Sequence, residues 1–64
     1  MKQYTLQQIR TDIIKLSQEK LAHSLGISLA SWSLKEQYKR SLKATELIKL
    51  SEMAKLDPRE IKLG

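Results

Sequence analysis

The segment from Ser17 to Trp32, SQEKLAHSLGISLASW, constrains the fold of this chain more than any other part of the sequence. Its apolar residues before the glycine have the spacing of one buried helix face. Gly26 follows at once and suits the left-handed conformation that ends a helix, and Ser28 can then cap a second helix. The segment therefore predicts a helix-turn-helix unit, with helices at residues 18–25 and 29–37.

The same helix-start signal recurs at four places along the chain. A small polar residue stands between an apolar residue just before it and another four positions after it, which is the pattern of a hydrophobic staple around an N-cap. These caps are Thr5, Ser17, Ser28 and Asp57, and the pairs Thr5–Gln8 and Asp57–Glu60 also have the spacing of capping boxes. Together with the apolar spacing, they predict one compact all-α domain over residues 1–64, with five helices at residues 6–15, 18–25, 29–37, 44–55 and 58–63.

Composition excludes several classes of function. The 64 residues allow one modest core and no deep active-site cavity. There is no cysteine, and His23 is the single histidine, so we expect no disulfide, metal site or cofactor. No nucleophile has a recognisable base near it, and no glycine-rich phosphate loop is present, so we expect neither an enzyme nor a small-molecule ligand.

The location and the partner follow from hydropathy and charge. No apolar run approaches the ~20 residues of a membrane span, and the N-terminal residues lack the apolar stretch of a signal peptide, so we expect a cytoplasmic protein and no membrane partner. Twelve Lys and Arg against seven Asp and Glu give a net charge of +5, which favours a polyanionic partner. An RNA partner is disfavoured, because one Trp, two Tyr and no Phe supply few stacking platforms.

Three blocks of the sequence resemble the small Cro and phage-repressor-type regulators, the lambda-repressor-like or XRE class. The blocks are LSQEKLAHSLGIS at 16–28, Glu36, and ELIKLSEMAKLDPREIKL at 46–63, and the alignment runs without gaps from about Leu6 to Leu63. The resemblance implies a five-helix lambda-repressor-like domain. It also implies a sequence-specific, DNA-binding transcriptional regulator of a phage or mobile element, which acts as a homodimer on double-stranded DNA.

The resemblance also implies which residues touch DNA. At the start of residues 18–25, Gln18 corresponds to a glutamine that binds a phosphate. The exposed face of residues 29–37 corresponds to the helix that reads base edges in the major groove. The loop that follows corresponds to a segment along the sugar–phosphate backbone. The expected contacts are Gln18 with Ser28, Leu29, Ala30, Ser33, Leu34 and Gln37 on the reading face, and Lys39, Arg40 and Lys43 in the loop.

The reading face departs from the family pattern, because Leu29, Ala30 and Leu34 stand where relatives often have polar residues. Apolar side chains can contact the methyl group of thymine in the major groove, which is our leading interpretation. The alternative is a protein-binding accessory module that uses the same apolar face. The dimer surface is expected in the last two helices, including Met53 and Leu63.

Four further positions carry expectations about structure. Trp32 is expected in the core and Lys35 on the surface, where it would add to the basic face. Tyr38 stands where the family usually has a glycine in a left-handed turn. Because tyrosine tolerates that conformation poorly, the sequence predicts a longer helix or another loop path. Glu36 is expected to stabilise the loop after the reading helix.

Overall fold

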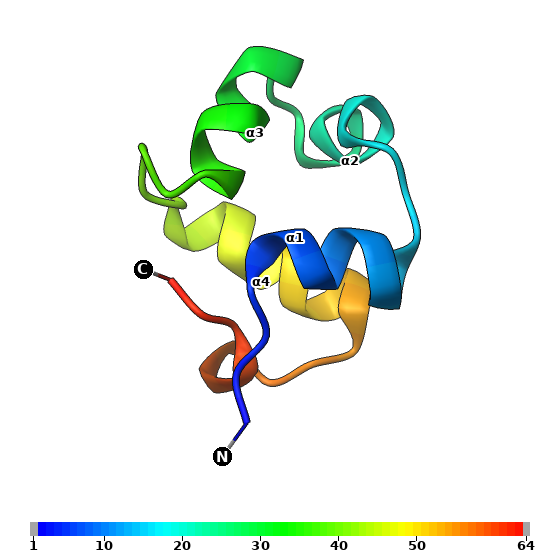
Figure 1. The fold of residues 1–64 in the computed structure, drawn as a ribbon, viewed down its shortest axis with the longest axis vertical. Coiled ribbons are helices and arrows are strands. Elements are labelled where there is room, and N and C mark those ends of the chain that lie inside the picture. Colours follow the sequence, from blue (N-terminus) through cyan, green and yellow to red (C-terminus); the bar gives the residue numbers. More distant parts are fainter. Residues whose placement is uncertain (1, 64) are drawn as a thin grey trace.

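In this computed structural model, which describes residues 2–63, the chain forms four helices and one short 3-10 turn (Figure 1). The first helix begins as α1 (Leu6–Gln8) and continues without a break as a π-helix, η1 (Ile9–Ile14). The later elements are α2 (Gln18–Leu25), α3 (Leu29–Glu36), α4 (Ala44–Ala54) and the 3-10 turn η2 (Pro58–Glu60). The predicted all-helical class is confirmed, and the predicted count of five helices is wrong.

The four predicted caps are confirmed. Each side-chain oxygen accepts a hydrogen bond from a backbone N–H of the helix that follows, which satisfies a group that the first turn leaves without a partner. The caps are Thr5 to Gln8 N at 3.1 Å, Ser17 to Lys20 N at 3.2 Å, Ser28 to Ser31 N at 3.1 Å and Asp57 to Arg59 N at 2.9 Å. Both predicted capping boxes also form, since Gln8 and Glu60 accept from the N–H groups of Thr5 and Asp57.

The first helix differs from the prediction of an α-helix over residues 6–15, because its second half widens into a π-helix. At its end, the N–H groups of Lys15 and Leu16 both donate to the carbonyl of Arg10. The guanidinium of Arg10 reaches the same end, where Nη1 donates to the carbonyl oxygen of Leu16 at 3.1 Å. Arg10 therefore closes this helix with its backbone and its side chain, at a position that cap signals do not mark.

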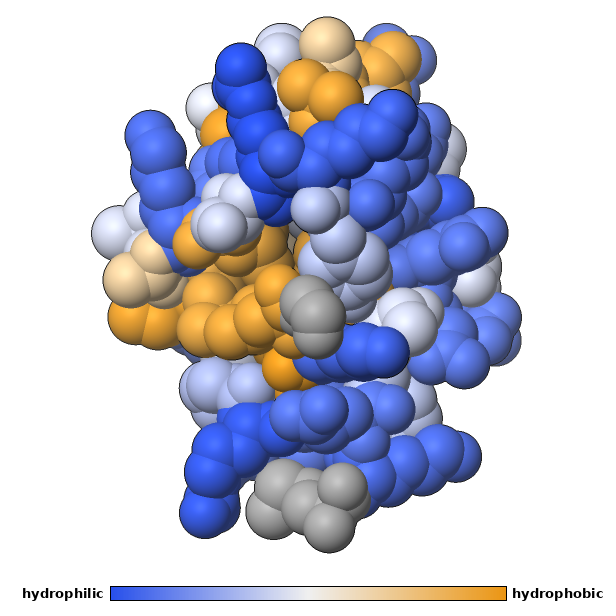
Figure 2. All heavy atoms as spheres, turned by 60° about the vertical axis from the view of Figure 1, so that its left-hand side comes forward, coloured by the Kyte–Doolittle hydropathy of each residue, from blue (hydrophilic) through white to orange (hydrophobic). Residues whose placement is uncertain are grey.

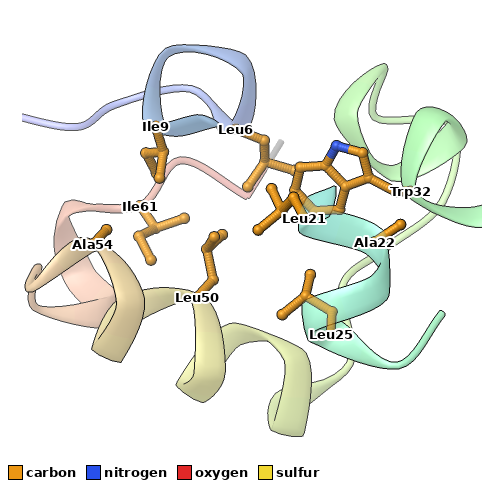
Figure 3. Packing of buried hydrophobic residues seen from close by; sticks show 9 residues of the cluster. All are labelled: Leu6, Ile9, Leu21, Ala22, Leu25, Trp32, Leu50, Ala54 and Ile61. Atoms are coloured by element: carbon orange, nitrogen blue, oxygen red, sulfur yellow. The ribbon is translucent and has the colours of Figure 1, made fainter. Parts of the chain in front are cut away.

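The predicted fifth helix over residues 58–63 does not form beyond η2. Ile61 is extended, and it pairs in parallel with Tyr4 from the N-terminal segment. The Tyr4 N–H donates to the Glu60 carbonyl at 2.8 Å, and the Lys62 N–H donates to the Tyr4 carbonyl at 2.9 Å. These bonds use backbone groups that a longer helix would need, and the pairing buries Ile61 (Figure 3).

Nine buried apolar side chains from all the main elements converge in one core (Figure 3). Trp32 reaches from α3 towards Leu6 and Leu21, and it is fully buried, so its predicted core position is confirmed. The members are Leu6, Ile9, Leu21, Ala22, Leu25, Trp32, Leu50, Ala54 and Ile61. α3 packs mainly against α2, and α4 packs against η1, α2 and η2. None of the helices within residues 2–63 is long and apolar enough to cross a membrane.

Candidate nucleic-acid interface

The corner between α2 and α3 has the geometry that the sequence predicts. Gly26 is left-handed with φ of 74°, and its N–H donates to the His23 carbonyl at 3.1 Å. The Ile27 N–H donates to the Ala22 carbonyl at 3.0 Å, which completes a Schellman motif. Ile27 then packs against the core. The chain turns sharply here, and α3 begins directly after its cap (Figure 1).

α3 has two distinct faces. Trp32 and Lys35 are buried on one side. Helical spacing places Leu29, Ala30, Ser33 and Leu34 on the other side, while Ser28 and Gln37 are the N-cap and the C-cap of the helix. Ser28, Leu29, Ala30 and Gln37 are exposed, while Ser33 and Leu34 are half-buried. The structure therefore leaves all six predicted reading residues at least partly exposed, four along α3 and one at each of its ends.

Apolar atoms dominate the first turn of this face. Leu29 is 47% exposed, and Ala30 beside it is also exposed. Figure 2 shows apolar surface at the top of the molecule, where α3 begins. Further along, Gln37 Nε2 donates to Ser33 Oγ at 3.0 Å, so these two polar side chains hold each other in place. The face thus pairs apolar contacts at its start with oriented hydrogen-bonding groups at its end.

The Glu36 side chain connects α3 to η1 and α2 through hydrogen bonds. Its carboxylate accepts from Arg10 Nε at 2.5 Å, from Gln18 Nε2 at 2.7 Å and from Trp32 Nε1 at 3.2 Å. The Glu36 side chain is only 8% exposed, so these charge-assisted bonds are largely shielded from water. The expectation that Glu36 stabilises the loop after α3 is wrong, because its hydrogen bonds fix the orientation of α3 against η1 and α2.

Gln18 therefore has a defined orientation at the first position of α2. Its side-chain amide carries two N–H groups, and the bond to Glu36 uses one donor direction. The backbone N–H groups of the first turn of α2 lie beside it, and Ser17 caps one of them. The arrangement leaves a half-buried amide, held by an acid, next to a helix N-terminus.

Lys35 does not extend outward, and this prediction is wrong. Its Nζ donates to both carboxylate oxygens of Glu46 on α4, at 2.5 and 2.6 Å, and the two side chains are 7% and 5% exposed. Burial raises the pKa of Glu46, but hydrogen bonds from Lys35 and the Lys43 N–H, with the charges of both lysines, outweigh burial and hold this pKa below its ordinary value. The pair ties α3 to α4, so Lys35 adds nothing to the basic face.

Tyr38 adopts the left-handed conformation that the sequence argues against. Its φ is 62°, and α3 neither lengthens nor takes another exit, so this prediction is wrong as well. The Tyr38 N–H donates to the Lys35 carbonyl at 3.0 Å, and the Lys39 N–H donates to the Leu34 carbonyl at 2.9 Å. This is the Schellman motif with a tyrosine where glycine is usual. The physical reason is that its hydroxyl bonds to Leu6 and Lys62, which offsets the cost of the left-handed conformation.

The three loop cations that follow are solvent-exposed. Lys39, Arg40 and Lys43 lie between α3 and α4, and no acidic residue occurs from Gln37 to Thr45. The salt bridges found within residues 2–63 use Arg10, Lys35 and Arg59 instead. Leu42 packs against the core and fixes the far end of the loop. The loop therefore presents positive charge to solvent beside the end of the α3 face.

The sequence predicts the exposed face of α3 and the basic loop, but it does not predict the polar contacts that fix their positions. The Lys35–Glu46 pair and the Tyr38 contacts join residues 11 to 32 positions apart, and no local spacing marks them. A tyrosine at position 38, where a left-handed glycine is usual at the end of a helix, is the signal that could have pointed to a special contact. No group of three or more His, Cys, Asp or Glu side chains within residues 2–63 could hold a metal ion.

No family model, curated protein or solved structure matches this chain.

Proposed function

We propose that this protein is a sequence-specific DNA-binding transcriptional regulator of the Cro or phage-repressor type, carried by a phage or mobile element. The observation that carries the proposal is the outward face of α3, which follows the Gly26 corner and ends beside an exposed basic loop. A helix presented in this way fits the major groove of B-form DNA, which is about 12 Å wide.

Base recognition would begin with apolar contact. Leu29 and Ala30 expose methyl groups at the start of α3, and the C5-methyl of thymine is the apolar feature of the major groove. Leu34 continues the same stripe one turn on, and Gln37, oriented by Ser33, can pair with an adenine edge. The expected half-site is therefore rich in thymine, with discrimination that depends on the thymine methyl.

Backbone contacts would supply most of the affinity. Lys39, Arg40 and Lys43 are exposed and would neutralise phosphates, and each neutralised phosphate releases a counterion. Gln18 and the N-terminus of α2 form a second phosphate contact, because an oriented amide and free helix N–H groups favour an anion. These contacts position α3 without reading sequence.

A homodimer is part of the proposal, because the eight residues of α3 span only about 12 Å and read few base pairs. Two copies would bind half-sites about 34 Å apart. Apolar surface lies at mid-height in Figure 2, beside the C-terminal segment. Leu63 is 54% exposed, and Met53 on α4 is half-buried, so these remain the residues we assign to the dimer contact.

A protein-binding accessory module is the second candidate function, and the exposure of Leu29 is the observation that favours it. An apolar side chain with this exposure also suits a hydrophobic protein contact. The two functions differ in salt dependence. DNA affinity falls steeply with added salt, whereas an apolar protein contact does not.

Selection of bound sites from a random DNA library tests the proposal directly. We expect a palindromic consensus rich in thymine. Replacing single thymines of the selected site with deoxyuridine removes only the methyl group and should weaken binding at the positions that Leu29 and Leu34 contact. Leu29→Gln should change the preferred base there and leave non-specific affinity intact.

Arg40→Ala is the matched contrast to Leu29→Gln. It should weaken all duplexes similarly and lower the slope of log affinity against log salt by about one unit. A library that yields no enriched site, with a salt-insensitive partner instead, would replace DNA binding with the protein-binding function.

A further inference from the structure

Tyr38 occupies the left-handed position that ends α3, where the β-carbon of any residue other than glycine is unfavourable. Its backbone completes the Schellman motif with Lys35 and Leu34. Glycine would form the same backbone bonds without that cost. The tyrosine side chain must therefore contribute something that the backbone motif alone does not.

The Tyr38 hydroxyl joins three distant segments. It accepts from the Leu6 N–H at 3.1 Å, a group at the start of α1 that has no partner within its own helix. It donates to the Lys62 carbonyl at 2.8 Å in the C-terminal segment. That segment already pairs with Tyr4. A single hydroxyl thus links the end of α3 to both ends of the chain.

Lys39 and Arg40 follow Tyr38 directly, so the direction in which the chain leaves α3 sets where their charges lie. Leu42 packs on the core beyond them, so the two cations lie between Tyr38 and Leu42, which both contact the rest of the domain. With the hydroxyl bonds present, the loop is fixed before any ligand arrives. Preorganisation of this kind raises affinity by reducing the entropy lost on binding.

We propose that Tyr38 is a positioning residue for the phosphate contacts, which holds Lys39 and Arg40 in the orientation that DNA requires. This inference rests on the proposed DNA-binding function. Since the contacts it governs are to the backbone, its loss weakens binding to every sequence alike.

The test is Tyr38→Phe, which keeps the ring and removes only the hydroxyl. Tyr4→Phe is the matched control, because it makes the same chemical change at the other tyrosine. We expect Tyr38→Phe to lower affinity for mixed-sequence duplex DNA by roughly threefold to tenfold, the loss that corresponds to about one hydrogen bond. Tyr4→Phe should leave affinity unchanged, and base preference should be the same in all three proteins.

A double-mutant cycle separates positioning from general stability. If Tyr38 acts through the loop cations, its effect on affinity should shrink when Lys39 and Arg40 are both replaced by alanine. Additive effects would assign Tyr38 a purely structural role and overturn the inference, as would a Tyr38→Phe protein with wild-type affinity. A wild-type protein that binds no duplex would instead overturn the proposed function.

A second measurement uses the wild-type protein and applies even if the variant does not fold. Hydrogen exchange of the Leu6 amide reports opening of the Tyr38 hydroxyl bond, and the Gln8 amide, bonded to Thr5 at 3.1 Å, is the reference in the same helix. Saturating mixed-sequence DNA should protect Leu6 more than Gln8, because linkage between loop and hydroxyl is reciprocal. Equal protection of the two amides would contradict the proposal.

Discussion

α2 and α3 end in the same way but for different reasons. At both ends a left-handed residue donates to a carbonyl three residues back, and the next residue donates to a carbonyl five back. At Gly26, φ is 74° and an added β-carbon would meet no atom within 4 Å, so the turn follows from glycine's own conformational freedom. At Tyr38, φ is 62°, and two hydroxyl bonds to distant segments accompany the turn.

The difference separates a local corner from a tertiary one. The Gly26 corner needs only the residues around it, and it orients α3 against α2. The Tyr38 corner depends on α1, α4 and the C-terminal segment, because the Lys35–Glu46 pair and the hydroxyl both converge on it. Destabilising substitutions elsewhere in the domain should therefore disturb the basic loop more than the Gly26 corner.

The largest expected effect comes from removing the core packing on which both corners depend. Trp32 is fully buried, so Trp32→Ala should destabilise the fold by roughly 3–5 kcal/mol, enough to unfold a domain of this size. Denaturant unfolding followed by circular dichroism measures it. A folded Trp32→Ala protein that has lost only DNA binding would show that Trp32 is not the common support.

Breaking the buried ion pair should affect one corner more than the other. Glu46→Gln leaves Lys35 without its partner and should cost roughly 3 kcal/mol. Because the Lys35 carbonyl accepts from the Tyr38 N–H, amide exchange should increase more at Tyr38 than at Gly26. An equal increase at both amides would contradict a tertiary Tyr38 corner.

The same pair predicts a pH dependence. The pKa of Glu46 is held below its ordinary value of 4.5, so its contribution to stability is complete above that pH and is lost as the pH falls through the lowered value. Wild-type stability should therefore decline on acidification below about pH 5. Glu46→Gln should decline less steeply over the same range.

Glycine at Tyr38 should reveal what the side chain contributes. Tyr38→Gly relieves the left-handed strain but removes two hydroxyl bonds worth about 1 kcal/mol each, so we expect a net loss of about 1 kcal/mol or more. Lys55→Gly is the matched control at the left-handed end of α4, where φ is 56°. Lys55→Gly should stabilise the fold by about 0.5 kcal/mol. Stabilisation by both variants would show that the Tyr38 side chain does not support its turn, and would remove the distinction between the Gly26 and Tyr38 corners.

The last expected effect is confined to the local corner at Gly26. Gly26→Ala should destabilise by about 1 kcal/mol through backbone conformation alone, because space for the β-carbon is open. Thermal unfolding measures this cost. DNA affinity per folded molecule should fall less than in Tyr38→Phe, and a larger fall would make the Gly26 corner the one that governs binding.

What the sequence predicts correctly is what neighbouring residues decide. Ser17, Ser28 and Gly26 act within a few positions of themselves, so the caps, the corner and the exposed face of α3 follow from local spacing. What it misses depends on distant partners. Lys35 is buried because Glu46 lies opposite it. Tyr38 adopts a left-handed conformation where its hydroxyl bonds to Leu6 and Lys62.

The C-terminal segment illustrates the same limit. The cap at Asp57 starts a helical turn as predicted, but the chain then pairs with Tyr4 instead of continuing. That choice depends on the position of the N-terminal segment, which no local signal reports. Of the candidate interface, the sequence therefore predicts which residues are exposed but not the contacts that hold them in place.

An amide chemical-shift map of isotope-labelled protein, titrated with the selected duplex, tests the central claim most directly. We predict shifts concentrated at Gln18, across residues 28–34 and across residues 37–43. Only small shifts are expected at residues 4–8, through Tyr38. Shifts confined to α2 and the far side of α4, or none at the α3 face with saturating DNA, would contradict the account.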